Sequence, residues 1–227
     1  MLILVAALLA GTVGRAADTA IDVGDAYIHE GTGGHQWTVG NSGIATSIVA
    51  TKIGVLIESL DRPGHANLVV PQIGDAGFAY DGTSSMVGDR TYRYVGASSA
   101  AVDGRAVLTI TYALRDRPIT VHRHYAVAPG VPALELWTTV ESDSAITVHD
   151  PSPFSLEFTL RDAWWQRGLE VLDNDGGGPF ERRTQRLGDG ATVEFGSDVL
   201  SSRQTMPWFG LSGDGERITA GLVWSGT

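Results

Sequence analysis

Apolar and polar side chains alternate along most of this chain, and this period of two constrains the fold more than any other feature. The clearest stretch begins at Ala106, where one side is apolar throughout: Ala106, Leu108, Ile110, Tyr112 and Leu114. Successive side chains of a strand point to opposite faces of a sheet, so the pattern predicts a strand with one buried face. From Ile44 onward the three-four spacing of an amphipathic helix is absent. We therefore predict an all-β chain.

Short turn sequences separate the alternating stretches and predict hairpins. The turn at residues 115–118 leads from the first long strand to a second, whose apolar face also carries a charged residue: Ile119, Val121, Arg123, Tyr125 and Val127. The turn at 129–132 opens a third strand at Leu134, so three strands form a meander. We also predict a hairpin of residues 44–50 and 55–60 about Gly54, an alternating strand from Phe154 to Leu160, and a final hairpin of 208–211 with 218–224.

Long strands joined by turns and loops favour a large two-sheet antiparallel β-sandwich. The 227 residues include 29 glycines and 9 prolines, as a chain that turns often requires. We predict that one domain spans residues 35–227, without an internal repeat or linker, after a leader at 17–34. Residues 61–104 and 172–190 are predicted to be the irregular parts, and long loops on a rigid scaffold often carry function.

Charge and composition exclude several classes of function. The net charge is −10, and Lys52 is the one lysine among 16 basic residues, so the chain lacks the basic patch that nucleic acids require. It contains no cysteine, which excludes disulfides, a thiolate zinc site and a cysteine nucleophile. No phosphate-binding loop or Gly-x-Ser-x-Gly motif occurs, and we predict neither a cofactor nor a metal.

The N-terminal residues are typical of an export signal. Residues 2–10 form an apolar run too short to span a bilayer, and Gly14 and Ala16 place small residues before a cleavage position. We predict a signal peptide at residues 1–16, a secreted protein and no membrane contact after cleavage. The alternative is a buried first strand of a cytosolic domain.

Two histidines stand two residues apart on a predicted strand. The rings of His122 and His124 therefore project from one face about 7 Å apart, since a strand rises about 3.3 Å per residue. Such a pair can hold a metal or move a proton, but two histidines on a solvated sheet face are the more common arrangement.

Carboxylates offer two further candidates. The stretch from Asp173 to Gly176 begins like a calcium loop, but the twelfth position is Thr184 rather than a bidentate glutamate, which favours a plain turn. Glycoside hydrolysis needs two carboxylates about 5 to 9 Å apart, and nothing in the sequence selects a pair among Asp150, Asp162, Asp173, Asp175 and Glu181.

Two adjacent tryptophans provide the best candidate binding residues. Trp164 and Trp165 stand among planar hydrogen-bonding groups at Arg161, Asp162, Gln166 and Arg167, a mixture suited to the apolar face and the hydroxyls of a sugar. Adjacent strand residues face opposite ways, so at most one ring belongs to the core. We predict a carbohydrate site at Trp164, Trp165, Arg161 and Arg167; the structural alternative places one ring in the core and covers the other.

Four segments together resemble a known family: WTVGNSGIATSIV from Trp37, ITVHRHYAVAPGVPALELWTTVES from Ile119, SSRQTMPWFGL from Ser201, and ITAGLVWSGT at the end. Over residues 35–227 the chain is similar to the N-terminal β-supersandwich of glycoside hydrolase family 36, the α-galactosidases, whose fold is galactose-mutarotase-like. In that family a (β/α)8 barrel follows a Trp-Ser-Gly segment, here Trp224 to Gly226, and holds both catalytic aspartates. The resemblance implies that the barrel would begin where this chain ends.

The resemblance thus implies a non-catalytic, carbohydrate-associated domain that partners an absent barrel and assigns no catalytic residue to this chain. An α-galactoside-like carbohydrate is the implied ligand. We predict an interface patch near Trp208, Phe209 and Trp224, because an inter-domain contact is partly apolar. The alternatives are a free-standing carbohydrate-binding module and a structural or adhesive surface domain.

Overall fold

The computed structural model describes residues 20–52, 54–73, 78–80, 83–85, 92–115, 118–149, 156–168, 179–188 and 205–221. These residues form antiparallel strands and no helix, which confirms the predicted all-β class. No helix within these ranges is therefore long and apolar enough to cross a bilayer. The chain divides into two compact units, with the boundary between Glu157 and Phe158, which the sequence pattern did not reveal. We describe the larger unit, up to Glu157, before the smaller one.

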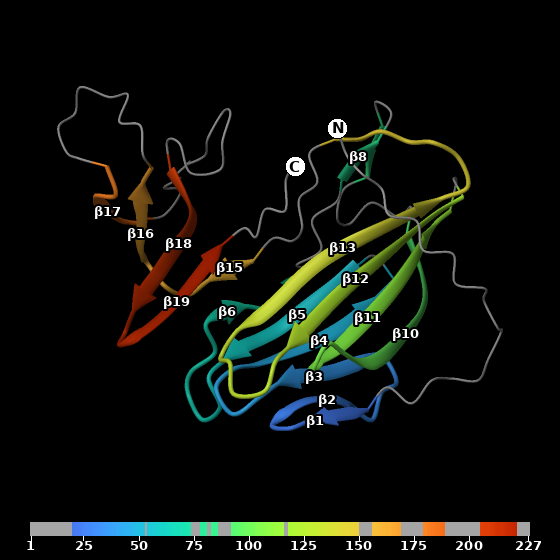
Figure 1. Ribbon diagram of the computed structural model, residues 1–227, viewed down its shortest axis with the longest axis horizontal. Helices are drawn as coiled ribbons and strands as arrows, with labels where there is room; N and C mark the ends of the chain where they lie inside the picture. The colour runs from blue at the N-terminus through green and yellow to red at the C-terminus, as the bar shows by residue number, and fades with distance from the viewer. Residues whose placement is uncertain are drawn as a thin grey trace. The chain divides into compact units, whose positions relative to one another are not determined.

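The first sheet of the larger unit has six strands in the order β1-β2-β3-β4-β5-β7 (Figure 1). They are β1 (Ile21–Val23), β2 (Ala26–Glu30), β3 (Gln36–Gly40), β4 (Ala45–Thr51), β5 (Gly54–Asp61) and β7 (Gln72–Ile73). The predicted hairpin about Gly54 is confirmed as β4 and β5, and Gly54 has a positive φ of 137°. The stretch expected as a leader contains β1 and β2. β1 pairs with β2, and β2 pairs with β3, so the sheet starts before residue 35.

The second sheet has four long strands in sequence order, β10-β11-β12-β13. They are β10 (Tyr92–Val102), β11 (Arg105–Leu114), β12 (Ile119–Val127) and β13 (Leu134–Ser142). The last three are the predicted meander, whereas β10 corrects the prediction that residues 61–104 are irregular. Small residues on both faces of β10 obscure its alternation. The turn that follows the strand, Asp103-Gly104, has two positive φ values and is a typical two-residue hairpin turn.

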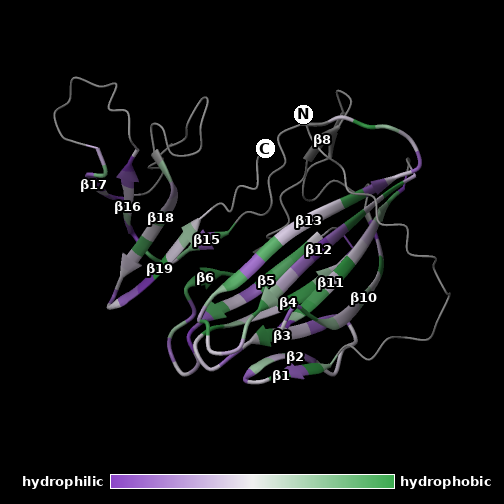
Figure 2. Ribbon diagram, viewed as in Figure 1, coloured by the Kyte–Doolittle hydropathy of each residue, from purple (hydrophilic) through white to green (hydrophobic). Residues whose placement is uncertain are grey.

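The two sheets pack against each other in a sandwich-like arrangement, with β2 against β11 and β3 against β12. Alternate residues of β11 and β12 are buried as predicted, and hydrophobic and hydrophilic residues alternate along these strands in Figure 2. The first sheet contributes Ile28, Trp37, Val39, Ile48 and Val55. Arg123 lies on the buried face, as predicted, and its guanidinium donates a hydrogen bond to the hydroxyl of Thr138.

Two polar residues link the turns at one end of this sandwich. Buried Asn41 follows β3, and its side-chain amide donates to the carbonyls of Ala128 and Val131 at 2.9 and 2.6 Å. Its side-chain oxygen accepts from the backbone amides of Gly43 and Ile44. The carboxylate of Asp25 accepts from the Ser42 hydroxyl at 2.6 Å and from the Gly130 amide at 2.7 Å. Both residues therefore join the first sheet to the turn between β12 and β13.

Five short strands complete the pairing. A three-stranded sheet contains β14 (Val148–His149), β8 (Phe78–Tyr80) and β9 (Thr83–Ser85), and β6 (Val69–Val70) pairs with β15 (Glu157–Phe158). The strand predicted from Phe154 to Leu160 is therefore corrected, within the described residues, to the two residues of β15, because the chain bends at Thr159 before the next strand. Phe154 itself lies outside the described residues.

The smaller unit contains one four-stranded sheet in the order β17-β16-β18-β19. Its strands are β16 (Asp162–Arg167), β17 (Arg182–Arg186), β18 (Thr205–Gly213) and β19 (Glu216–Gly221). The predicted final hairpin is confirmed as β18 and β19, joined by Asp214-Gly215 with both φ values positive. By contrast, the prediction that residues 172–190 are irregular is wrong where β17 lies. This strand could not be recognised because its sequence, RRTQR, has no apolar residue to alternate.

Candidate functional site

The register of β16 places its two tryptophans on opposite faces of the small sheet, as their adjacency predicts. Trp164 pairs with Thr184 on one side and Gly210 on the other, and Trp165 pairs with Arg183 and Phe209. Both rings are half-buried. The face of Trp165 also holds buried Ala163 and Leu211, so it is the apolar side of the sheet.

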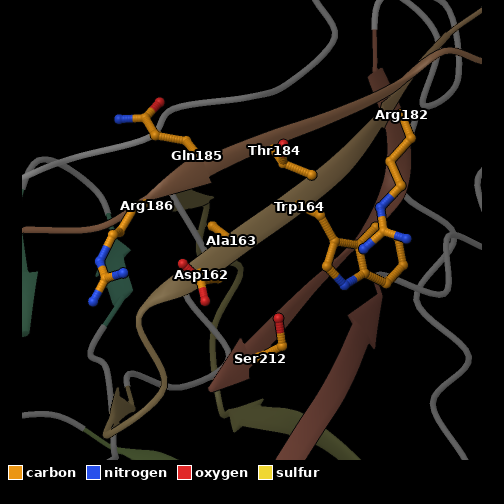
Figure 3. Close-up of a pocket in the computed structure, with 8 residues that line it drawn as sticks. All are labelled: Asp162, Ala163, Trp164, Arg182, Thr184, Gln185, Arg186 and Ser212. Carbon is orange, nitrogen blue, oxygen red and sulfur yellow. The ribbon is translucent and has the colours of Figure 1, made fainter. Parts of the chain in front are cut away.

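A hollow of about 250 Å³ lies beside Trp164. Three strands supply its lining, which is mostly polar: Asp162, Ala163 and Trp164 from β16, Arg182, Thr184, Gln185 and Arg186 from β17, and Ser212 from β18. Figure 3 shows Arg182 beside the Trp164 ring, with Asp162 and Arg186 nearer the opposite end of the strand pair. The hollow thus combines one large aromatic ring with charged and hydroxyl groups, while the Gln185 side chain points away from Asp162 and Ser212 (Figure 3).

The Trp164 ring is held between a glycine and an arginine. A β-carbon added to Gly210 would lie only 2.1 Å from the indole nitrogen, so the ring occupies the space that a larger residue would fill. The guanidinium carbon of Arg182 lies over the ring, 4.6 Å from its centroid, in cation–π geometry. Gly210 therefore allows the ring to approach the sheet, and Arg182 covers the ring from β17.

The charged groups of the hollow are exposed and, among the residues that the structure describes, make no ion pair with one another. Arg182 and Arg186 lie on the same face of β17, four residues apart, or about 13 Å along the strand. Asp162 is the cross-strand partner of Arg186 and of Ser212. The hollow therefore contains two cationic groups and one anionic group.

The structure does not bring the four predicted sugar-binding residues together in this hollow. Trp164 lines it, and Trp165 lies on the other face of β16. Arg161 precedes the strand and is exposed, and its carbonyl accepts from the Leu187 amide at 2.6 Å. Arg167 is buried at the other end, where its amide donates to the Glu181 carbonyl at 2.9 Å.

The predicted interface residues are also separated. Trp208 and Phe209 are consecutive on β18, so they face opposite sides of the sheet, and both are half-buried. Phe209 lies opposite Trp165, and Trp208 lies opposite Gly221. Trp224 lies outside the described residues, as does the stretch 173–176.

The predicted histidine pair forms a network on the face of β12 that points away from the sandwich core. The rings of His122 and His124 are 6.2 Å apart, close to the spacing that the sequence predicts. The Thr111 hydroxyl is 3.0 Å from Nδ1 of His122, and the carboxylate of Glu141 is 3.5 Å from its Nε2. This carboxylate comes from β13, which is why no local offset in the sequence revealed it.

His124 is the more completely satisfied of the two rings. Its Nδ1 lies 3.0 Å from the Thr109 hydroxyl and its Nε2 lies 2.9 Å from the Thr139 hydroxyl. The ring stacks on Trp137 at a centroid distance of 4.8 Å. Burial, reinforced by the charge of His122, lowers the pKa of His124 to about 4, so the ring is neutral at pH 7.

The described residues contain no cluster of three or more histidine, cysteine, aspartate or glutamate side chains arranged to hold a metal ion. Both nitrogens of His124 are already bonded to threonine hydroxyls. The nitrogens of His124 are therefore used within the protein, while Nε2 of His122 has no hydrogen-bond partner in the described residues and lies 3.5 Å from the Glu141 carboxylate. The hollow, by contrast, has several polar groups available to a ligand.

Sequence reasoning did not select the residues that β17 brings to the hollow. Arg182, Thr184 and Arg186 lie on one face of β17, but every residue of this strand is polar, so no periodicity in the sequence marks them. The predicted final hairpin ends its first strand at residue 211, whereas Ser212 lies in β18, directly opposite Asp162.

Comparisons with protein-family models, with curated proteins and with solved structures give no match to this chain. The function is therefore inferred from the chain's own residues and from the resemblance of its segments.

Proposed function

We propose that this protein is a secreted, non-catalytic β-sandwich module that binds carbohydrate, and that it corresponds to the N-terminal supersandwich of a family 36-like α-galactosidase. In this proposal hydrolysis of a glycosidic bond belongs to a separate (β/α)8 barrel. The sandwich-like sheets of the larger unit are compatible with that fold. The four resembling segments support the family assignment.

The observation that carries the carbohydrate function is the placement of Trp164 in the hollow. A sugar ring has apolar C–H faces and a rim of hydroxyls, so it needs a flat apolar surface beside donors and acceptors. The hollow offers the part of the indole that Gly210 and Arg182 leave uncovered, together with the hydroxyls of Thr184 and Ser212. Hydroxyls of a ligand match all of these groups.

Calorimetric titration of the purified chain with a panel of neutral and acidic oligosaccharides tests this function. Binding to at least one member is expected, and Trp164→Ala is expected to reduce it at least tenfold. Trp137→Ala is the matched control, because it removes a half-buried tryptophan from the other unit. If no saccharide binds, or if the two variants weaken binding equally, the hollow is not a carbohydrate site.

The non-catalytic assignment has its own test. The chain alone should not cleave an aryl α-galactoside, because the family's catalytic aspartates belong to the barrel. Turnover that disappears when one of this chain's own acidic residues is replaced would contradict the assignment.

A further inference from the structure

The cationic groups of the hollow indicate which class of sugar it takes. Arg182 and Arg186 both line it, and neither has a hydrogen-bond or ion-pair partner within the described part of the chain. A neutral sugar would need no more than one such group. Two guanidinium groups on one strand face provide ten N–H donors and no acceptor, which suits a ligand rich in anionic oxygen.

The stacking of Arg182 on Trp164 prepares this guanidinium for an anion. Its carbon lies 4.6 Å from the ring centroid, so the indole covers one face of the planar group. The donors of a guanidinium lie in its plane, and stacking on a face leaves them directed outward. A carboxylate accepts two parallel bonds from such an edge, and this fork geometry is more selective than contact with a point charge.

The carboxylate that lines the hollow lies at the end away from Trp164. Asp162 is the directly paired neighbour of Arg186, whereas Arg182 lies opposite Gln166, so among the described residues of this sheet no carboxylate pairs with Arg182. The net charge of −10 is distributed over 227 residues. At physiological ionic strength charges are screened beyond about 8 Å, so the nearest groups decide which ligand is favoured.

We infer that the hollow binds a saccharide that carries a carboxylate, that is, a uronic acid unit, in preference to a neutral galactoside. This inference rests on the proposed carbohydrate function of the same hollow. The carboxylate pairs with the edge of the Arg182 guanidinium, Arg186 meets a second acidic unit or a ring hydroxyl, and Thr184 between them bonds a hydroxyl.

A matched pair of ligands tests the inference directly. Trigalacturonate and neutral galactotriose present the same ring stereochemistry and differ at carbon 6, and acetate supplies a carboxylate without a sugar. Calorimetry on the full chain should show trigalacturonate binding at least tenfold more tightly than galactotriose. Arg182→Gln and Arg186→Gln should each weaken trigalacturonate binding about tenfold, and raising the salt concentration should also weaken it.

Two further variants separate a ligand contact from a general effect. Arg182→Lys keeps the charge but loses the planar fork, so it should bind trigalacturonate less tightly than the wild type. Arg93→Gln removes an exposed arginine of β10 in the larger unit and should leave binding unchanged. Unfolding midpoints close to the wild-type value confirm that each exposed substitution leaves the sheet folded.

Each outcome has a definite meaning. Equal affinity for both trisaccharides leaves the carbohydrate function standing and overturns the preference for uronic acid. Acetate as strong as trigalacturonate overturns the inference, because the sugar then contributes nothing. Binding to neither trisaccharide, nor to any other saccharide, overturns both the inference and the proposed function.

Discussion

Two polar sheet faces of this protein contain similar kinds of residue but use their hydrogen-bonding groups in different ways. On β11–β13, threonine hydroxyls bond to both nitrogens of His124 and to Nδ1 of His122, and Trp137 stacks on the His124 ring. On the hollow face of β16–β18, the indole of Trp164 stacks with Arg182, and the neighbouring charged groups have no described partner. Most polar groups of the first face are bonded within the protein, as in a core, whereas those of the second face are open to a ligand, as in a binding site.

This comparison separates stability from function. A polar group bonded within the protein contributes to folding, and removing its partner leaves it unsatisfied. An exposed polar group bonded to water contributes little until a ligand displaces that water. Substitutions on the histidine face should therefore change stability, and those on the hollow face should mainly change binding, except where packing intervenes.

The largest effect is expected where packing does intervene, at Gly210. The methyl group in Gly210→Ala would lie 2.1 Å from the Trp164 ring, so the ring or the strand must move. Overpacking of this kind typically costs about 1–3 kcal/mol. Urea unfolding followed through the amide signals of β16 and β18 measures the loss of stability.

Gly96 provides the control on the histidine face, where it pairs with Thr111. A β-carbon added to Gly96 meets nothing within 4 Å, so Gly96→Ala should be neutral or slightly stabilising. Equal behaviour of the two alanine variants would show that the Trp164 ring does not lie over Gly210.

The next effect concerns a hydroxyl on the histidine face. Thr109→Val keeps the shape of the side chain but removes the hydroxyl 3.0 Å from Nδ1 of His124. One ring nitrogen then loses its partner, which should cost about 1 kcal/mol in the free energy of unfolding. Urea unfolding with the amide signals of β11 and β12 as probes measures it.

Thr184→Val makes the same chemical change on the hollow face. Thr184 is exposed and has no hydrogen-bond partner in the described residues, so its loss should change stability by less than about 0.5 kcal/mol. If the two valine variants lose equal stability, the contrast between a satisfied face and an open face is wrong.

A further effect on stability is expected from a change of pH. The pKa of His124 in the folded protein is lowered to about 4 from an ordinary value of 6.5, first by burial and then by the charge of His122. The unfolded chain therefore binds the proton more readily, so the stabilising contribution is full above pH 6.5 and is lost as pH falls toward 4. The carboxylate of Glu141 faces the His122 ring from β13.

An NMR titration of the His124 ring carbons, with unfolding midpoints measured from pH 7 to pH 4, tests this prediction. The ring should titrate near pH 4, and His124→Gln should flatten the fall in stability over that range. Hydrogen bonds lower the pKa of Asp25, and its contribution starts to be lost only below about pH 5, so the His124→Gln variant separates the two contributions. A His124 titration near pH 6.5 would show that the ring is not held as described.

The sequence predicted the fold best where one face of a strand is buried. The alternation from Ala106 to Leu114 identified β11, and the same argument identified β12 with Arg123 on its buried face. Neither argument works for β10, whose small residues lie on both faces, or for β17, which contains no apolar residue. Periodic hydrophobicity reports burial, and these strands have too little of it to be recognised.

The candidate site was predicted in part, for a related reason. Alternation correctly placed Trp164 and Trp165 on opposite faces of one strand. It did not select Arg182 as the partner of Trp164, because cross-strand register depends on pairing across residues 168–181. The need for glycine at position 210 could not be predicted either, because only the pairing of β16 with β18 brings Gly210 under the indole of Trp164.

A small effect on stability is expected from Arg182→Gln, and its size tests the contrast between the two faces directly. The guanidinium lies 4.6 Å from the Trp164 ring but is exposed, and cation–π contacts at exposed sites contribute about 0.5–1 kcal/mol. We expect a loss of about 0.5 kcal/mol together with a change in tryptophan emission. Arg182→Lys should recover part of that loss, because an ammonium also interacts with the ring face. A loss of several kcal/mol would mean that Arg182 is a structural residue of the small sheet, and the hollow face would then resemble the histidine face after all.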